Sequence, residues 1–162
     1  MTPFFAAPSR FAALESAAAA WLGTPYVQSG AVRGSGASCH MLAAAVLTDA
    51  GYPIAPPPRG TTKLREYTAT MRAWLDGQPE RLAPVSLDAL QPGDILLCEI
   101  GIGHIALYLG GPDRRALQVL RQSPAHYVSL GDPQARQHLI AAWRPLDLSG
   151  SSTPPFAICD PQ

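Results

Sequence analysis

The stretch GSGASCHMLAAAVLTDAGY, residues Gly34–Tyr52, runs from a glycine-rich loop directly into an alanine-rich segment. Alanine, leucine and methionine favour helices, so this pattern predicts a helix over residues 39–50. Ser38 stands at the N-cap position, and Gly51 stands just past the end, where a left-handed glycine stops many helices. Pro53 and the three prolines that follow it prevent the helix from continuing.

Cys39 occupies the first turn of this predicted helix. Unpaired backbone N–H groups and the positive end of the helix dipole favour a thiolate there and lower the pKa of a cysteine thiol. Gly34 and Gly36 let the preceding backbone approach a substrate without side-chain obstruction. Two interpretations stay open at this point: Cys39 is a nucleophile, or it is a small residue that packs the helix onto its neighbours.

A thiolate nucleophile needs a base, and the four histidines differ in their surroundings. His40 adjoins Cys39 and would point about 100° away around the helix axis. His126 and His138 lie in polar segments that are typical of a surface. His104 opens the most apolar strand of the chain, directly after a Gly-Ile-Gly turn, and is therefore the candidate base.

A hairpin register supplies a partner for this histidine. If residues 104–109 pair with residues 113–118 across a Gly-Gly-Pro turn, His104 faces Gln118. Facing side chains lie within contact, so the Gln118 amide would accept the imidazole N–H and fix the ring. Cys39, His104 and Gln118 then form a nucleophile, a base and an orienting group.

Predicted helices precede predicted strands along the chain. Apolar residues at helical steps predict a first helix, capped by Ser9 and ended by Gly23, and a later helix over residues 61–76. Further apolar runs predict strands at residues 90–100, 104–110, 116–123, 126–130 and 139–146. This order predicts an α+β domain, with N-terminal helices packed on a mostly antiparallel sheet of five to six strands.

The composition excludes several classes of protein. The 162 residues are 47% hydrophobic and 15% charged, which suits one domain over residues 1–146 and a Pro- and Ser-rich tail over residues 147–162. Basic and acidic residues balance at 12 each, so nucleic acid and membrane partners are not expected. Cys39, Cys98 and Cys159 form no C-x-x-C pair, so neither a zinc site nor a disulfide framework is expected.

The apolar segments give an expectation about location. The first residues, MTPFFAAPSRFAALESAAAAWLG, lack the basic start and uninterrupted apolar core of a secretory signal. Residues 95–111 are the most apolar, but they contain Glu99 and His104 and are too short to span a bilayer. We therefore expect cytoplasmic synthesis without a signal peptide.

Other motifs carry no chemistry of their own. The glycines before Cys39 are not followed by the Gly-Lys-Ser/Thr of a phosphate loop. Asp94, in a Pro-Gly-Asp sequence, is interpreted as a turn or capping residue, and Cys98, on an apolar strand, as a core residue. The spacing of Cys39 and the histidines does not favour a metal site over the triad, and no cofactor is expected.

Two motifs in this order resemble the NlpC-type cysteine peptidases. Residues 21–26, WLGTPY, with Ser-Cys-His at 38–40, are similar to the LGTPY and Asp-Cys-Ser elements of that family. Residues 90–111, LQPGDILLCEIGIGHIALYLGG, are similar to its PGD element, followed by a strand and Gly-His. The resemblance covers about residues 19–145 and implies a papain-like cysteine peptidase fold that hydrolyses amide bonds in peptidoglycan stem peptides.

The resemblance assigns roles at matching positions. It implies that Cys39 is the nucleophile and His104 the base, and that Gln118 takes the place of the polar third residue. Tyr26 matches a tyrosine whose hydroxyl lies near the nucleophile and helps hold the oxyanion. No metal or cofactor is implied.

Two departures from the family pattern adjoin the nucleophile. Ser38 replaces an aspartate; it still caps the helix and removes a negative charge beside the thiolate. His40 places a bulky ring where a small residue is usual, so we expect it to affect the positioning of the substrate. The long spacer before residues 92–94 and the Trp-Arg-Pro at 143–145 are similar to the branch found with phage tails and gene-transfer particles. Components of such particles are therefore candidate partners, and delivery in a phage-like particle is the expected route to the cell wall.

The sequence thus predicts a cysteine peptidase or amidase that acts on a peptidoglycan stem peptide or another short peptide. One alternative is an inactive, diverged scaffold that serves as a peptide-binding module or a phage-tail structural module. Another alternative is acyl transfer or deamidation by the same triad, which differs from hydrolysis only in the acceptor.

Overall fold

The computed structural model describes residues 1–59 and 63–149. Its helices are η1 (Phe4–Ala6), α1 (Pro8–Trp21), α2 (Cys39–Asp49), α3 (Leu64–Asp76), η2 (Leu87–Ala89) and α4 (Pro133–Arg136). Its strands are β1 (Ala31–Val32), β2 (Gly36–Ala37), β3 (Leu82–Val85), β4 (Ile95–Ile100), β5 (Ile102–Gly110), β6 (Arg115–Leu120), β7 (Ser123–Ser129) and β8 (Leu139–Pro145).

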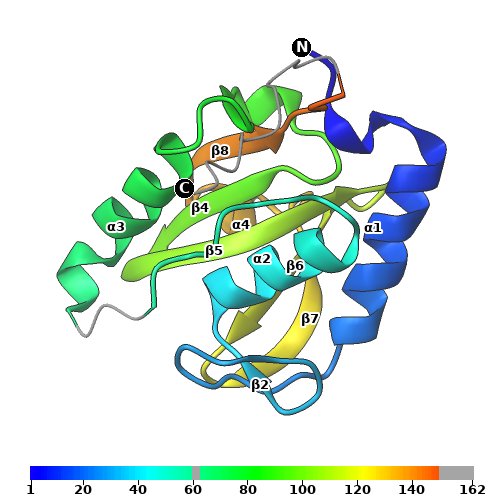
Figure 1. Ribbon diagram of the computed structural model, residues 1–162. Helices are drawn as coiled ribbons and strands as arrows, with labels where there is room; N and C mark the ends of the chain where they lie inside the picture. Colours follow the sequence, from blue (N-terminus) through cyan, green and yellow to red (C-terminus); the bar gives the residue numbers. More distant parts are fainter. Residues whose placement is uncertain (60–62, 150–162) are drawn as a thin grey trace, which may run out of the picture.

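Six strands form one sheet in the order β3-β8-β4-β5-β6-β7, and every neighbouring pair is antiparallel (Figure 1). Strands β4 to β7 are consecutive hairpins. The chain then returns through α4, and β8 inserts between β4 and β3. Strands β1 and β2 pair separately, in the loop before α2. The predicted α+β class and antiparallel sheet are confirmed.

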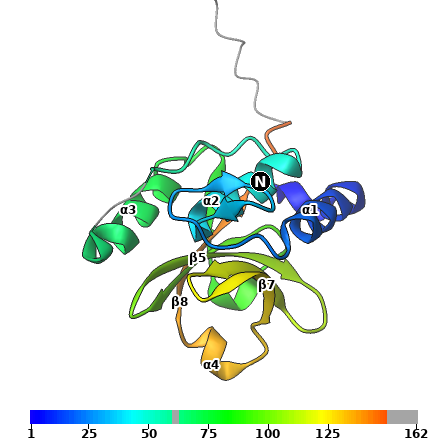
Figure 2. The same cartoon turned by 90° about the horizontal axis from the view of Figure 1, so that it is seen from below.

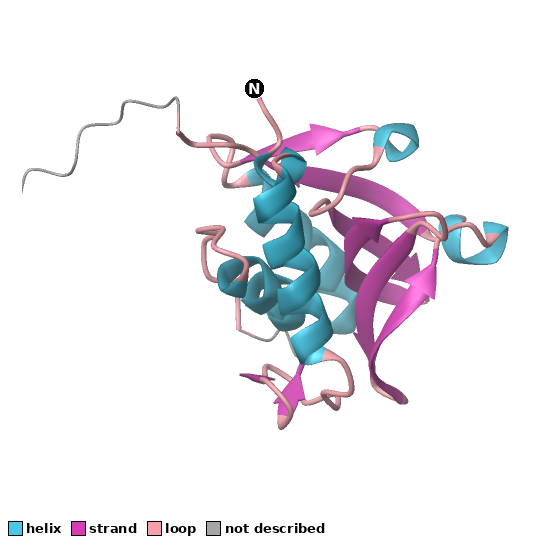
Figure 3. Cartoon of the chain, turned by 90° about the vertical axis from the view of Figure 1, so that its right-hand side faces the viewer, coloured by secondary structure: helices cyan, strands magenta, loops and turns pink. Residues whose placement is uncertain are grey.

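Helices and sheet form two layers. Helices α1, α2 and α3 cover one face of the curved sheet, and the single turn of α4 lies on the opposite face (Figures 2 and 3). Strand β4 contributes side chains to both faces of the sheet, because successive side chains of a strand point to opposite faces. Ile95 and Leu97 join the core beneath the helices, whereas Leu96 and Cys98 join a second cluster.

Helix α2 is enclosed between α1 and the sheet. Leu42, Val46 and Leu47 are fully buried in the helix-side core. The small alanine side chains of this helix let its backbone approach α1 and the sheet closely. Because most of the helix surface is covered by these neighbours, the segment has no polar face. Gly51 has a φ of +87°, so the predicted left-handed stop is confirmed.

Several local predictions are wrong. Helix α1 begins at Pro8 with Ala7 at the N-cap, so Ser9 is not the cap. Proline suits the first turn because backbone N–H groups there have no partner within the helix, so the N–H that proline lacks costs no hydrogen bond. The sequence analysis also missed β3 and the small β1–β2 hairpin. These strands are short, so they show little alternation of polar and apolar residues.

The ends of two predicted segments fall outside the described residues. Of the predicted tail, residues 150–162 lie there; Asp147 is described, and its carboxylate lies 2.9 Å from the Arg10 guanidinium. The first residues of the predicted helix over 61–76 also lie there, and the described part begins at Leu64.

A buried ion pair joins the turn before β4 to strand β8. Asp94 is fully buried, and its carboxylate oxygens lie 2.9 and 2.8 Å from Nε and an Nη of Arg144 on β8. The carboxylate also accepts the Gln91 backbone N–H at 2.7 Å, which closes the turn before β4. Asp94 is therefore the predicted turn residue, with a second role as the counterion of Arg144.

Candidate active site

Cys39 is the first residue of α2 and lies at the base of a pocket of about 90 Å³. Its side chain retains 9% of its exposure. The pocket walls come from the loop before α2, the start of α3, the start of β5 and the turn after β6. The lining residues are Tyr26, Gln28, Ser29, Ser38, Cys39, His40, Leu64, Tyr67, Ile102, Gly103 and Arg121.

His104 is buried on β5, and its orientation follows from a hydrogen-bonded series. The Pro124 carbonyl oxygen lies 2.7 Å from Nδ1 of His126, so that nitrogen carries the hydrogen and Nε2 is an acceptor. The Gln118 NH₂ group donates to this Nε2 at 3.2 Å, which turns Oε1 of Gln118 toward His104. Oε1 accepts from Nε2 of His104 at 3.0 Å, and Nδ1 of His104 is left for the sulfur of Cys39.

This series corrects one prediction and explains another. His126 is half-buried and holds the Gln118 amide, so it is not simply a surface residue. The β5–β6 register is shifted by two residues from the predicted one, with Leu107 opposite Leu117 and a bulge at the turn. A shift of two keeps a side chain on the same face, and a diagonal neighbour remains within reach of a long side chain. Gln118 therefore still meets His104.

The thiol and the imidazole favour an ion pair. Burial alone raises the pKa of Cys39, but the His104 and His40 rings, the charge on His104 and the Tyr67 hydroxyl outweigh it, and the thiol pKa falls well below its usual range. Burial alone lowers the pKa of His104, but its hydrogen bond to Cys39, the thiolate charge and Gln118 raise the pKa overall. In such a pair the thiolate is a strong nucleophile, and the imidazolium beside it can act as a general acid.

Tyr67 is a site residue that the sequence analysis missed. It lies on α3, and its hydroxyl is 2.9 Å from Sγ of Cys39. Burial and the neighbouring Cys39 charge raise the pKa of Tyr67, so it stays a neutral phenol. Tyr67 falls within the helix predicted over residues 61–76, and a position in a predicted helix carries no signal for a distant sulfur.

Gly103 lets α3 approach the strand closely enough for this contact. A Cβ at Gly103 would lie 2.7 Å from Cδ1 of the Tyr67 ring and 3.1 Å from the backbone nitrogen of Thr68. Any larger residue would push α3 and its tyrosine away from Cys39.

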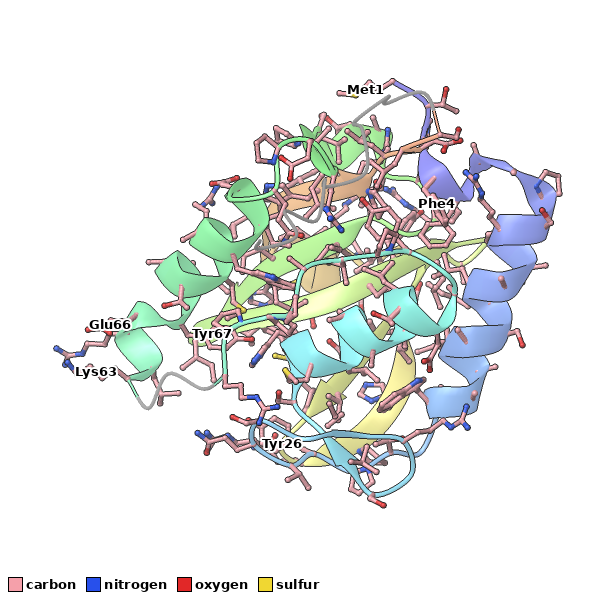
Figure 4. All side chains as sticks on the ribbon, in the orientation of Figure 1. Met1, Phe4, Tyr26, Lys63, Glu66 and Tyr67 are labelled. Atoms are coloured by element: carbon pink, nitrogen blue, oxygen red, sulfur yellow. The ribbon has the colours of Figure 1, made fainter. Side chains whose placement is uncertain are left out.

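Tyr26 lines the same pocket, in the loop before α2, and lies apart from the Tyr67 side chain (Figure 4). Its backbone bridges to that of Ala37, just before the helix. The Arg121 guanidinium carbon lies 5.7 Å from the centre of the Tyr26 ring, within cation–π range. The tyrosine hydroxyl that hydrogen-bonds Cys39 is that of Tyr67.

Ser38 and His40 adjoin Cys39 in the sequence and make different contacts. Ser38 occupies the N-cap position, but its side chain makes no capping bond, and its buried hydroxyl has no partner among the described residues. The predicted N-cap position is therefore confirmed, but the predicted capping by the Ser38 side chain is wrong. The His40 ring is buried; Nδ1 lies 3.0 Å from the Tyr67 hydroxyl and Nε2 lies 3.1 Å from the Pro58 carbonyl oxygen.

The other described thiol is a core residue. Cys98 lies opposite His104 in the β4–β5 pair, and burial, followed by the charge of Cys39, raises its pKa to about 12. Among residues 1–59 and 63–149, no cluster of His, Cys, Asp or Glu side chains is arranged to hold a metal ion. Within the same residues, no helix is long and apolar enough to cross a membrane.

Comparisons with known proteins give structural matches only. No protein-family model and no curated protein sequence matches the chain. A protein similar to a lipoprotein of the NLP/P60 family from Staphylococcus aureus matches 89% of the chain, with a TM-score of 0.60 and 23% identity. An NlpC/P60 family protein from Bacillus cereus matches 82%, with a TM-score of 0.57 and 20% identity.

A third structure is the NlpC/p60 domain of the peptidoglycan hydrolase SagA, which matches 82% of the chain with a TM-score of 0.52 and 21% identity. The match covers 96% of that domain, but only 44% and 39% of the first two chains. None of the three is described as a phage-tail protein, so that partnership stays a prediction. The chain therefore adopts the papain-like α+β fold of NlpC/P60 family proteins.

Proposed function

We propose that the chain is a cysteine peptidase or amidase that hydrolyses a peptide amide bond, with peptidoglycan stem peptides as its substrate class. The observation that carries the proposal is the placement of His104, which donates to Oε1 of Gln118 at 3.0 Å and interacts with the Cys39 thiol at a helix N-terminus beside a pocket. The fold shared with the domain of a peptidoglycan hydrolase supports the choice of substrate.

The proposed reaction has two halves. The Cys39 thiolate attacks the carbonyl carbon of the amide, and the carbon–nitrogen bond breaks while His104 gives its Nδ1 proton to the leaving amine. A thioester to Cys39 remains. Neutral His104 then takes a proton from a water molecule, which attacks the thioester and releases the acid, and the thiolate–imidazolium pair is restored. Gln118 holds the ring in position through both halves.

The backbone offers one donor for the oxyanion of each tetrahedral intermediate. The Cys39 N–H belongs to the first helical residue, so it has no partner within the helix. Tyr26, on the pocket wall, is the proposed second donor. Both act where negative charge develops, beside the positive end of the α2 dipole.

The charge of the pocket supports a substrate that carries a carboxylate. Arg121 is the only Lys, Arg, Asp or Glu side chain among the described residues that line the pocket. No carboxylate pairs with Arg121 in the described part of the chain. A guanidinium matches a carboxylate in geometry and charge, so Arg121 is proposed to bind an acidic group of the peptide.

The direct test measures new amino groups after incubation with peptidoglycan fragments, with products identified by mass spectrometry. Wild type should release amines, and Cys39→Ala should release none because the nucleophile is gone. Cys98→Ala is the matched control: it removes a buried thiol whose pKa is raised to about 12, and we expect it to retain activity. Equal amine release by wild type and Cys39→Ala would contradict the proposal.

A further inference from the structure

The Tyr67 hydroxyl lies between two ionisable groups at hydrogen-bond distance. It is 2.9 Å from Sγ of Cys39 and 3.0 Å from Nδ1 of His40. The other ring nitrogen of His40, Nε2, is 3.1 Å from the Pro58 carbonyl oxygen. The reaction proposed above uses neither Tyr67 nor His40, although one contacts the nucleophile and the other adjoins it in sequence.

The Pro58 carbonyl decides which hydrogen His40 carries. A carbonyl oxygen only accepts, so Nε2 of His40 holds a hydrogen in both protonation states. In the neutral ring Nδ1 is bare, and it accepts the single hydroxyl hydrogen of Tyr67. The Tyr67 oxygen then presents only lone pairs to the sulfur, which suits a thiol S–H and opposes a thiolate.

A proton on His40 reverses this hydrogen bond. Nδ1 then donates to the Tyr67 oxygen, and the hydroxyl hydrogen is free to turn to Sγ of Cys39. A hydrogen bond to a charged acceptor is stronger than one to a neutral group, so the turned hydroxyl stabilises the thiolate. Both nitrogens of His40 have a hydrogen-bond partner in either state, Tyr67 and Pro58, so the hydrogen-bonded route from the ring to the sulfur runs through Tyr67.

We propose that Tyr67 is a further catalytic residue, which donates its hydroxyl hydrogen to the Cys39 thiolate when His40 is protonated and to His40 when it is neutral. His40 is then a positioning residue that acts on the nucleophile through Tyr67. The proposal rests on the proposed peptidase function, because it describes how the nucleophile of that reaction is held.

The groups around His40 leave this exchange undisturbed. The titratable groups that face the ring are Tyr67 from α3 and Cys39 from α2, with His104 from β5 beyond the sulfur. Among the described residues, no carboxylate forms an ion pair with His40. The segment at 60–62, Gly-Thr-Thr, contributes no titratable side chain.

The test follows the Cys39 thiolate by its ultraviolet absorbance and by its rate of alkylation with iodoacetamide. Measurements run from about pH 5 to pH 8, where histidines titrate, in proteins that carry Cys159→Ser. Wild type should show two steps, one for Cys39 with His104 and one that requires both Tyr67 and His40. Tyr67→Phe should lose the second step, and its thiolate fraction at the acidic end should fall about tenfold, which corresponds to one pKa unit.

His40→Gln removes the ring nitrogen that lies 3.0 Å from the Tyr67 hydroxyl, so it should also show one step. The double variant should show no further loss of steps, because both residues act through one hydrogen. Tyr52→Phe is the matched control: it removes a buried phenol hydroxyl that donates to the Arg81 carbonyl, beyond the far end of α2, and should keep the wild-type profile.

Two results would overturn the proposal: a Tyr67→Phe profile that matches wild type and Tyr52→Phe, or a His40→Gln profile that keeps both steps. If His40→Gln does not fold, Tyr67→Phe alone decides. The readout needs no substrate, so it is separate from the peptidase assay. Two steps without hydrolysis would support this hydrogen-bond exchange and contradict the proposed function. Hydrolysis with a single step would support the proposed function and contradict the exchange.

Discussion

Replacing Arg144 with methionine tests how the buried ion pair holds the sheet. The Arg144 guanidinium donates twice to Asp94 and once more, at 2.6 Å, to the Ala89 carbonyl oxygen. Arg144→Met keeps the apolar stem of the side chain but removes every one of these donors. The Asp94 carboxylate would then be buried without a counterion, at the turn that begins β4.

The expected loss is large for a single substitution. Removing one partner of a buried pair costs about 3 to 5 kcal/mol. The Arg144 side chain is 14% exposed, so solvent screens the pair slightly and the lower value, about 3 kcal/mol, is appropriate. For a chain of this size that corresponds to a fall in Tm of roughly 6 to 12 °C.

The loss should depend on pH. Burial raises the pKa of Asp94, and the Arg144 guanidinium lowers it. Without Arg144 the folded-state pKa rises further above the unfolded value, so folding favours the protonated carboxyl more strongly. The ionised carboxylate therefore destabilises the variant at neutral pH. This cost disappears as pH falls through the raised folded pKa, so the difference from wild type should shrink.

Urea unfolding at neutral pH and at about pH 5 measures both effects. Arg115→Met is the matched control, because Arg115 pairs with Glu15 where the two side chains are 35% and 41% exposed, and such pairs contribute under about 1 kcal/mol. Asp94→Asn combined with Arg144→Met should be more stable than Arg144→Met alone at neutral pH. If Arg144→Met loses no more stability than Arg115→Met, the reasoning about the buried pair is wrong.

The remaining predictions concern the proposed reaction. Activity should rise with pH as Cys39, whose pKa is lowered, ionises, and should fall as His104, whose pKa is raised, loses its proton; a pH–rate profile without both limbs would contradict the ion pair. Arg121→Gln should raise KM for a peptide with a free carboxylate and leave KM unchanged for the same peptide with that group amidated, and equal KM changes would exclude a carboxylate contact. His126→Ala frees the Gln118 amide to flip, so kcat should fall several-fold with KM unchanged, and unchanged kcat would show that Gln118 is held without it.

Most of the helices and long strands, and the contact between His104 and Gln118, could be predicted from the sequence because their signals are local. Alternating apolar runs and a helix bounded by Ser38 and Gly51 depend on neighbours a few residues away. The pairing of His104 with Gln118 survived an error in the register, because a shift of two residues preserves the face of a strand. The same reasoning failed at Ser9 and for the Ser38 cap, where several local arrangements satisfy the same pattern.

The sequence by itself determined the α+β class, the helix that begins at Cys39 and the strand that begins near His104, because propensity and periodicity act between close neighbours along the chain. Only the tertiary structure decided that the Tyr67 hydroxyl, 28 residues away, lies 2.9 Å from Sγ of Cys39 and that Asp94 pairs with Arg144, 50 residues away. Such contacts depend on how α3 and β8 pack against the sheet. That packing is set by the summed burial of the whole core, and no short stretch of sequence contains it.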